Sequence, residues 1–411
     1  MGILLDLAYA IAACCLAPWW MRKKRRDWRQ RLGHISCPPS PEGRRRILLH
    51  AVSVGEVNCL RALVPMLTDD CDVVISVTTD TGIDRARALF TGSATVVRYP
   101  LDFSRAVRRF LGAVEPDLVL LAELELWPNF IRACRQRSIP IAIINGRLSD
   151  RSFKRYAALR PVLGPWFRSL AAVAAQNETY ARRFAAVGAD PDRVHVLGSM
   201  KWDSAPTTSD NPEQPGAGAE ELAGALGIDR SRPLIVAGST APDEHALLHE
   251  STPQGVQLLC APRRPEWFDD AARDLPGCVR RSQPGSGDPA SGRFLLDTIG
   301  ELRAAYALAD VVVIGRSFGD LWGSDPMEPA ALGKPIVMGP ACADFREAVT
   351  KLKEAGGLIR TTRDDLRETL DALISDAPRT AQMAEAARAC VRDNQGASER
   401  HAQMIREFLA K

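Results

Sequence analysis

Short apolar runs alternate with longer amphipathic stretches over most of the chain. In the first half, the apolar runs lie at 47–54, 73–78, 95–98, 118–122, 139–144, 171–175 and 194–197. Runs of this length with few polar interruptions are typical of strands that a parallel sheet buries on both faces. Because helical patterns separate them, the sequence predicts a doubly wound α/β sheet with ligands at the carboxyl ends of its strands.

The same alternation begins again in the second half. Its apolar runs lie at 234–237, 256–260, 294–296, 311–314, 336–338 and 357–359, and amphipathic patterns follow at 363–375 and 380–409. Between the halves, 203–218 is rich in Pro, Ser, Thr and Gly and has no periodicity, which is typical of a linker. We therefore predict two Rossmann-like domains, at 32–202 and 228–411, joined by a linker at 203–227 and facing each other across a cleft. That arrangement suits a transferase with a nucleotide donor in one half and an acceptor in the other.

The chain begins with an apolar segment followed by a basic one. Residues 3–20 are apolar except for Asp6 and end in Pro-Trp-Trp, and M-R-K-K-R-R-D-W-R-Q-R follows at 21–31. A cleaved signal peptide carries its charge before its apolar part, so this order argues against one. About 18 apolar residues make a short span, and the tryptophans and basic residues suit the headgroups of an anionic cytoplasmic leaflet. We predict that 1–31 is a membrane anchor, spanning or interfacial, with the rest of the chain cytoplasmic; the alternative is a buried first helix with a solvated charged face.

Composition narrows the class of protein. The 411 residues are 46% hydrophobic and 25% charged, values that suit a globular protein of two domains and exclude a disordered or fibrous chain. A net charge of +3 argues against a dedicated nucleic-acid binder. The ten cysteines form no C-x-x-C pair and are typical of reduced cytosolic thiols, and His245 and His249 lack the glutamate of a zinc-protease motif. The sequence contains no P-loop, Cys/His zinc set or Asp-rich loop, so we expect no catalytic metal and no cofactor.

Polar residues follow several predicted strands of the first half, beginning with S-V-G-E at 53–56. A buried strand delivers Ser53, Gly55 and Glu56 to its carboxyl end, where Gly55 lets a ligand or another chain come close. Glu56 then begins a helix, whose dipole favours the ionised carboxylate. An ionised carboxylate in this place suits a general base for a sugar hydroxyl, and the alternative is an ordinary helix N-terminal charge.

A second strand end carries a pair of carboxylates. Glu123 and Glu125 are two positions apart, so an extended segment would project both from one face. Carboxylates rarely serve packing because their burial is costly, which leaves hydroxyl binding, acid–base chemistry or pairing with a basic residue. Three more polar residues follow strands of this half, and for them a ligand role and a surface or hinge role are both open: Asn145, Arg147 and Lys201.

The second half contains a glycine-rich loop between a strand and a helix. The strand at 311–314 leads into G-R-S-F-G-D-L-W-G at 315–323, and the next helix is predicted to begin near Asp325, with Pro326 at an early position that tolerates proline. Backbone N–H groups and the helix dipole favour a phosphate there, and a carboxylate in the first helical turn can hold a ribose hydroxyl. The alternative is an α/β protein with an ordinary glycine loop. The donor residues predicted from this stretch are Gly315, Ser317, Asp325 and Glu328.

Two other strand ends of the second half add to the predicted donor site. Ser239 and Thr240 lie where a strand passes into a helix start, a place that suits phosphate. Arg263 and Arg264 follow the next strand, where a guanidinium can hold a phosphate or a carboxylate through two hydrogen bonds. We therefore predict that the second half binds the nucleotide.

Taken together, the motifs resemble those of one family. The chain contains, in order, H-A-V-S-V-G-E, E-L-E-L-W-P-N, I-N-G-R-L-S, A-A-Q-N-E, V-L-G-S-M-K-W-D, P-R-R-P-E and D-P-M-E-P-A-A-L-G-K-P-I-V-M-G-P. This order and spacing resemble the 3-deoxy-D-manno-octulosonic acid (Kdo) transferases of lipopolysaccharide synthesis. The resemblance extends from the N-terminal segment to N-Q-G-A at 394–397, which is essentially the whole chain.

The resemblance implies a GT-B glycosyltransferase at the cytoplasmic side of the inner membrane that transfers Kdo from CMP-Kdo to a lipid A precursor. It also implies inversion in one displacement, with no metal in the chemical step. Glu56 matches the general base of the family, and Glu125 matches the second glutamate of its E-T-E-L-W-P-N motif. Glu328 matches the ribose-binding glutamate, and Arg263 would face the phosphate or the sugar carboxylate of the donor.

The sequence departs from the family pattern mainly in the donor loop. The family usually has G-G-S before the loop and G-G-H-N-P-L-E after it, whereas this chain has G-R-S and W-G-S-D-P-M-E. Arg316 thus replaces a glycine, and Trp322, Ser324 and Asp325 stand where Gly, His and Asn are expected; E-L-E also replaces E-T-E. A GT-B enzyme that uses another nucleotide sugar, such as a UDP-sugar, is therefore the first alternative. The second is a non-catalytic nucleotide-sugar-binding membrane protein, which would have no need of the carboxylates in the first half.

Overall fold

The computed structural model describes Asp6, Tyr9 and residues 26–204 and 218–410. The chain divides into two compact units, of which unit 1 comprises Met1–Ser204 with Gln395–Lys411 and unit 2 comprises Ala205–Asn394. The predicted membrane anchor at 1–31 and the predicted linker at 203–227 lie in large part outside the described residues. Among the helices that are described, none is both long enough and apolar enough to cross a membrane.

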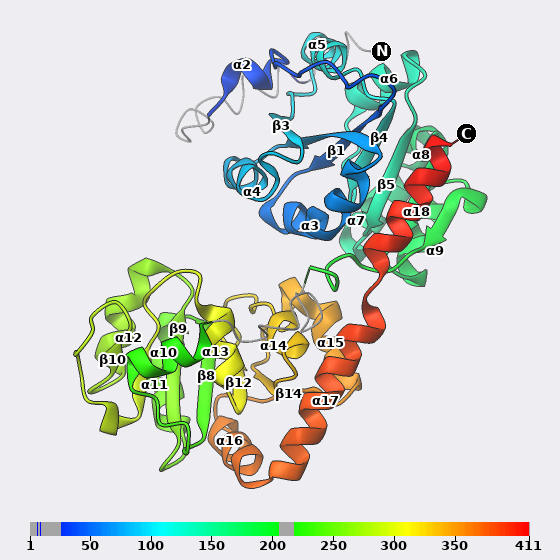
Figure 1. The fold of residues 1–411 in the computed structure, drawn as a ribbon. Coiled ribbons are helices and arrows are strands. Elements are labelled where there is room, and N and C mark those ends of the chain that lie inside the picture. The colour runs from blue at the N-terminus through cyan, green and yellow to red at the C-terminus, as the bar shows by residue number, and fades with distance from the viewer. Residues whose placement is uncertain (1–5, 7–8, 10–25, 205–217, 411) are drawn as a thin grey trace. The chain divides into compact units, whose positions relative to one another are not determined.

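Unit 1 contains a seven-stranded sheet in the order β3-β2-β1-β4-β5-β6-β7, and every pair of neighbours is parallel. The strands are β1 (Arg45–Ala51), β2 (Cys71–Val77), β3 (Thr95–Arg98), β4 (Leu118–Ala122), β5 (Ile141–Gly146), β6 (Ala172–Ala175) and β7 (Val194–Val196). The helices are α2 (Trp28–Arg31), α3 (Val54–Thr68), α4 (Asp80–Phe90), α5 (Ser104–Val114), α6 (Pro128–Gln136), α7 (Asp150–Ala158), α8 (Arg160–Arg168), α9 (Glu178–Val187) and α18 (Ala397–Leu409). The predicted doubly wound sheet is confirmed, with helices on both of its faces (Figure 1).

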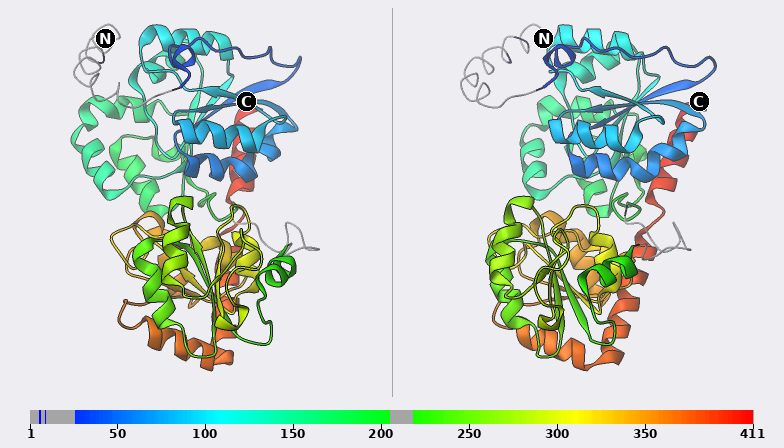
Figure 2. Two further views of the ribbon diagram at one scale, coloured as in Figure 1. Left: turned by 90° about the vertical axis from the view of Figure 1, so that its left-hand side faces the viewer. Right: turned by 60° about the vertical axis from the view of Figure 1, so that its left-hand side comes forward.

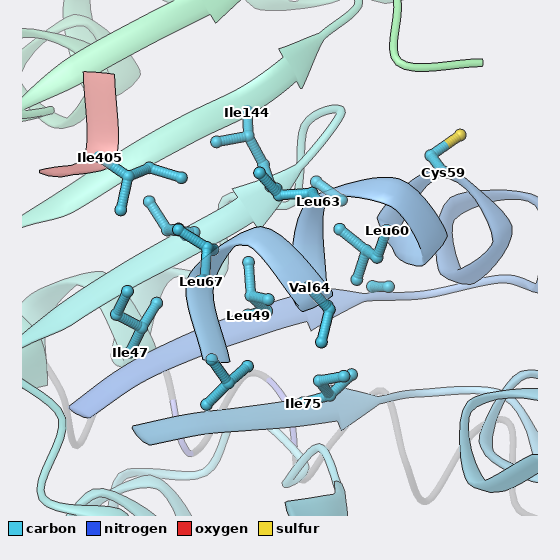
Figure 3. Close-up of a cluster of buried hydrophobic side chains, with 14 of the residues drawn as sticks. Ile47, Leu49, Cys59, Leu60, Leu63, Val64, Leu67, Ile75, Ile144 and Ile405 are labelled. Atoms are coloured by element: carbon cyan, nitrogen blue, oxygen red, sulfur yellow. The ribbon is translucent and has the colours of Figure 1, made fainter. Parts of the chain in front are cut away.

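Successive side chains of the central strand enter different cores. Ile47 and Leu49 of β1 pack with apolar residues of α3, α4 and α18, whereas Leu48 between them packs with residues of α5 and α6. Figure 3 shows the first of these clusters, to which α18 contributes Ile405. A strand buried on both faces needs apolar residues at every position, which is why it appears in the sequence as an unbroken run.

Unit 2 repeats the architecture, with helices around a second sheet (Figure 2). This sheet has seven parallel strands in the order β10-β11-β9-β8-β12-β13-β14. The strands are β8 (Leu234–Thr240), β9 (Gln257–Pro262), β10 (Val279–Arg280), β11 (Arg293–Leu295), β12 (Val311–Ile314), β13 (Ile336–Met338) and β14 (Leu358–Arg360). The helices are α10 (Ala219–Leu226), α11 (Pro242–Ser251), α12 (Phe268–Asp274), α13 (Leu302–Leu308), α14 (Met327–Ala331), α15 (Arg346–Glu354), α16 (Leu366–Ser375) and α17 (Ala377–Asn394). The two-residue strand β10 is too short to leave a pattern in the sequence.

The amphipathic pattern predicted at 380–409 forms two helices rather than one. Helix α17 ends at Asn394, and α18 begins after Gly396, whose φ of 82° breaks the helix. The Asp203 carboxylate accepts hydrogen bonds from the N–H groups of Gly396 and Ser398 at 2.7 and 2.5 Å, so it caps α18. The last helix therefore belongs to unit 1, although the predicted second domain extends to residue 411.

Candidate active site

The strand order of unit 1 determines where its site lies. The chain proceeds outward from β1 to β2 and β3 and then resumes at β4, so that β1 and β4 are neighbours. At such a reversal, the loops that leave the two strands diverge and a crevice opens at the carboxyl ends. Glu56 follows β1, whereas Glu123 and Glu125 follow β4. The three carboxylates therefore line one cavity.

Glu56 lies in the first turn of α3 and is held by the residues just before the helix. Its Oε2 accepts a hydrogen bond from the Val52 N–H at 2.8 Å, and its Oε1 accepts one from the Ser53 hydroxyl at 2.9 Å. Ser53 is the N-cap and accepts from the Glu56 N–H at 3.4 Å, so the two residues cap the helix reciprocally. Burial raises the pKa of Glu56, whereas the Val52 N–H opposes that rise. Glu56 is thus a stronger base than an exposed glutamate and has a defined orientation.

Glu125 is the second carboxylate of the cavity. Burial and then the negative charge of Glu56 raise its pKa to about 7. The Trp127 indole N–H donates to Oε2 of Glu125 at 2.9 Å and favours the ionised form. Near neutral pH, Glu125 is divided between carboxylate and carboxylic acid, so it can accept or donate a hydrogen bond.

Glu123, the third carboxylate, is compensated by cations. Its Oε1 lies 3.0 Å from Nζ of Lys201, and its Oε2 lies 4.0 Å from Nη1 of Arg147. Burial lowers the pKa of Lys201, but the charge and hydrogen bond of Glu123 and the nearby Cys59 together outweigh this, and the net shift is upward. The φ of Glu123 is 56°, so the segment is not extended as the sequence argument assumed, although Glu123 and Glu125 still line the same cavity.

The cavity has a volume of about 250 Å³. It is lined by Glu56, Glu123, Leu124, Glu125, Arg147, Ser149, Ser152 and Tyr156. Sequence reasoning missed Ser149, Ser152 and Tyr156, although S-D-R-S directly follows a strand end and Ser149 is the N-cap of α7. Burial and the charge of Glu125 raise the pKa of Tyr156, which keeps its hydroxyl a hydrogen-bond donor. Within the described residues, no three His, Cys, Asp or Glu side chains come together in a way that could hold a metal ion.

The other residues predicted on the acceptor side lie near the cavity without lining it. A Cβ at Gly55 would meet nothing nearer than Ser53 Oγ at 3.8 Å, so packing does not require glycine there. Asn145 is buried, and its Oδ1 accepts from the Met200 N–H at 3.1 Å while its own N–H donates to His401 Nε2 at 3.0 Å. Asn145 thus ties the end of β5 to the segment before Lys201 and to α18.

Unit 2 has a corresponding reversal between β8 and β12. The glycine loop after β12 lies against the end of β8 there, and a Cβ at Gly315 would come within 2.4 Å of Thr240 Cα. Glycine is therefore required at position 315. The Ser317 hydroxyl is fully buried between the Ile314 carbonyl, to which it donates at 2.6 Å, and the Gly339 N–H, from which it accepts at 2.8 Å.

Three N–H groups of the glycine loop already have an anionic acceptor in the protein. The fully buried Glu244 carboxylate accepts from the N–H groups of Arg316, Ser317 and Phe318 at 2.7, 2.8 and 3.0 Å, and from that of Ala241 at 2.9 Å. The glycine-loop pattern predicts that these N–H groups bind a phosphate, and no sequence pattern marks Glu244 as their partner. Burial raises the pKa of Glu244, and the N–H groups oppose this. A donor phosphate must therefore find other partners.

Three of the predicted donor residues lie around the buried ring of Tyr306. Burial, then Glu328, then Asp325 raise the pKa of Tyr306, whereas Arg263 lowers it, which places all three within electrostatic reach of one hydroxyl. Arg263 is exposed, and Arg303 Nη1 lies 3.9 Å from Oε1 of Glu328 in the first turn of α14. Arg264, by contrast, stacks over Trp267 at 5.0 Å.

The departures from the family pattern surround this region. Arg316 adopts a φ of 58°, a conformation that favours the glycine usual in the family. Trp322 is 61% exposed and borders a hollow of about 590 Å³ that is also lined by Arg346, Lys353 and Arg360. Ser239, whose φ is 57°, accepts through its carbonyl from the Ser324 hydroxyl at 3.4 Å. The part of the loop that departs from the family pattern thus borders a hollow lined by three basic residues and Glu354.

Known proteins resemble this chain over nearly its whole length. Residues 26–204 match the family model described as 3-Deoxy-D-manno-octulosonic-acid transferase (kdotransferase). The chain is 30% identical to the 3-deoxy-D-manno-octulosonic acid transferase of Haemophilus influenzae, over 93% of this chain and 92% of that protein. It is 32% identical to the enzyme of the same name from Bordetella pertussis, over 98% and 99%.

A solved structure supports the two-sheet architecture. The UDP-GlcNAc 2-epimerase from Neisseria meningitidis, bound to UDP-GlcNAc, superposes with a TM-score of 0.61 over 89% of this chain and 100% of that one. At 15% sequence identity, this likeness concerns the fold alone. The fold is GT-B-like.

Proposed function

Because the chain belongs to the family of Kdo transferases and is a glycosyltransferase, we propose that it transfers Kdo from CMP-Kdo to a lipid A precursor in lipopolysaccharide synthesis. The observation that carries this proposal is the meeting of Glu56 and Glu125 in one cavity at the strand reversal of unit 1. A transferase needs a base for the acceptor hydroxyl at such a place. A protein that only binds a nucleotide sugar does not need it.

In the proposed reaction, a sugar hydroxyl of the acceptor attacks the anomeric carbon of Kdo. The new bond from the acceptor oxygen to that carbon forms as the bond from the carbon to the phosphate oxygen breaks, and CMP leaves with the bonding electrons. The proton of the hydroxyl passes to the Glu56 carboxylate. A single displacement of this kind inverts the anomeric centre.

The two carboxylates have different parts in this scheme. The Val52 N–H and the Ser53 hydroxyl hold Glu56 in place, and its raised pKa improves it as a base. Glu125, with a pKa of about 7, positions or polarises the acceptor through a hydrogen bond that it accepts or donates. Arg147 and Tyr156 line the same cavity and can bind further hydroxyl groups of the acceptor.

Unit 2 would hold the donor. Arg263 is exposed and suits the phosphate or the carboxylate of CMP-Kdo, and Glu328 suits the ribose hydroxyls. Since Glu244 accepts from the N–H groups of Arg316, Ser317 and Phe318, we propose that side chains rather than these loop N–H groups bind the phosphate. No cofactor or catalytic metal takes part in the proposed reaction.

We also propose that the protein acts at the cytoplasmic face of the inner membrane. The support is the sequence of 1–31, in which an apolar segment with terminal tryptophans precedes a basic one. Attachment to an anionic lipid surface would bring the cavity close to a lipid acceptor.

Mass spectrometry of a lipid A precursor incubated with CMP-Kdo and the purified protein tests the function. A mass gain of one or more Kdo units is expected and would establish donor, acceptor and number of sugars together. No gain, with CMP-Kdo intact, would contradict the proposal. Thermal-shift measurements with CMP- and UDP-sugars would then identify the nucleotide, because the altered loop around Arg316 and Trp322 favours a different sugar nucleotide as the second candidate.

A further inference from the structure

Two neighbouring helices of unit 1, one of which begins just after Glu125, lack caps of their own. Helices α5 and α6 start after Phe103 and Trp127, and neither of these N-cap residues makes a side-chain capping hydrogen bond. The first N–H groups of a helix have no partner within it, so they need acceptors from elsewhere. Here, two aspartates distant in the sequence supply them.

Asp6 and Asp102 cap these helices. The Ser104 N–H of α5 donates to Oδ1 of Asp6 at 2.9 Å. At α6, the N–H groups of Asn129 and Phe130 donate to the two oxygens of Asp102 at 2.9 and 2.8 Å. Asp6 is the lone charged residue of an apolar segment, where a carboxylate is costly unless it is paired, and these contacts account for its presence.

The Asn129 side chain joins the two caps. Its Nδ2 donates to Oδ1 of Asp6 at 3.0 Å and to the carbonyl of Asp102 at 2.6 Å, and Asn129 is only 3% exposed. The Tyr9 hydroxyl donates to Oδ2 of Asp102 at 3.0 Å, and its ring packs edge-on against Phe103 with centroids 6.1 Å apart. Asp6 and Tyr9 are thus built into the start of α6.

The same turn carries a residue of the proposed active site. Trp127 lies two positions before Asn129, and its indole N–H donates to Glu125 at 2.9 Å. We propose that Asp6 is a positioning residue for the transfer reaction. Through its contact with Asn129 it holds the start of α6 in place, and thereby orients the Trp127–Glu125 pair. This inference rests on the proposed function. It makes Asp6 and Tyr9 part of the support of the acceptor site.

The test compares Asp6→Ala with Asp6→Asn in the full-length protein, in detergent. We expect Asp6→Ala to lower kcat for Kdo transfer about tenfold, because small displacements of a reacting group cost such factors. The KM for CMP-Kdo should not change, since the donor residues lie in unit 2. Asp6→Asn keeps an Oδ1 acceptor for Ser104 and Asn129 and should restore kcat to within about threefold of wild type.

A double-mutant cycle separates positioning from a general loss of structure. If Asp6 acts through Glu125, Asp6→Ala should change kcat by less than about twofold in a Glu125→Gln background. A further tenfold loss in that background would overturn the inference, as would an Asp6→Ala variant with the kcat of wild type. If Asp6→Ala does not fold, Tyr9→Phe serves instead. Tyr9→Phe removes one hydroxyl and keeps the ring, with an expected two- to threefold loss of kcat that also disappears in the Glu125→Gln background.

Cosedimentation with anionic phospholipid vesicles tests whether weaker membrane attachment causes the loss of kcat in Asp6→Ala. Asp6→Ala should sediment as wild type does, and a loss of binding parallel to the loss of activity would contradict positioning. Failure of the proposed function would look different, because wild type itself would then transfer no Kdo.

Discussion

Replacing Glu56 by Gln tests the central assignment most directly. The amide has nearly the volume of the carboxylate, and its oxygen can still accept from the Val52 N–H or the Ser53 hydroxyl. The change therefore removes the base and keeps most of the helix cap. We expect the free energy of unfolding to fall by no more than about 1 kcal/mol, which corresponds to about 2–4 °C in Tm for a unit of this size.

The expected loss of activity is much larger than the loss of stability. General-base catalysis contributes about 10²- to 10⁴-fold, so kcat for Kdo transfer should fall by that factor, which corresponds to a rise of about 3–5 kcal/mol in activation free energy. The pKa of Glu125, about 7 in the wild type, should also fall, because the charge of Glu56 is one of the causes that raise it. A carboxyl titration by carbon NMR, with labelled glutamate and a Glu125→Gln spectrum for assignment, measures that shift.

The assay needs three readouts and a matched control. Mass spectrometry of the lipid gives kcat, calorimetry gives CMP-Kdo affinity and a thermal melt gives stability. Glu178→Gln is the control, because Glu178 also lies in the first turn of a helix in unit 1 but does not line the cavity. If Glu56 were merely a helix N-terminal charge, the two variants would behave alike. Equal activities, or a loss of CMP-Kdo binding together with activity in Glu56→Gln, would refute the assignment.

Three further predictions concern the surroundings of the two sites. Glu244→Gln should lower the free energy of unfolding of unit 2 by about 1–3 kcal/mol, because an amide cannot accept from all four N–H groups around it. Calorimetric melting measures this loss of stability, and an unchanged Tm would contradict it. Gly315→Ala should destabilise unit 2 and weaken CMP-Kdo binding in calorimetry, since its Cβ would lie 2.4 Å from Thr240 Cα. Burial raises the pKa of Asp102 to about 6, so its ionisation costs stability as pH rises from about 4 to 6. Urea unfolding should therefore show the stability of wild type falling relative to Asp102→Asn over that window, and a constant difference would refute the reasoning.

The architecture and half of the acceptor site were predictable because they depend on local patterns. Strands buried on both faces must be apolar throughout, so the runs at 47–54 and 311–314 mark them without any tertiary information. Function at the carboxyl ends of such strands follows from the direction of the chain. This is why Glu56, Glu123 and Glu125 were identified as candidates, and the structure places all three in one cavity.

Residues that depend on distant partners were not predictable. In the sequence, Glu244 looks like an ordinary glutamate at a helix start. In the structure, its carboxylate oxygens accept hydrogen bonds from N–H groups more than 70 positions away. For Asn145 the sequence leaves a ligand role and a surface or hinge role open, and only its partners in α18 and in the segment before Lys201 show that it is buried. The C-terminal pattern at 380–409 gave no sign that its helix divides between two units, because one glycine and the distant Asp203 decide that break.

The sequence by itself thus determined the two parallel sheets, the family and the strand ends that carry charge. Each of these depends on the order of residues along a short stretch. Only the tertiary structure decided which charges meet, which are compensated within the protein and which are left to bind a ligand. Of the three carboxylates that line the cavity, Glu123 is paired with Lys201, whereas burial raises the pKa values of Glu56 and Glu125; in unit 2, the buried Glu244 accepts from the loop N–H groups. The reason is physical: burial and pairing set the properties of a carboxylate, and both are fixed by neighbours that folding brings from elsewhere in the chain.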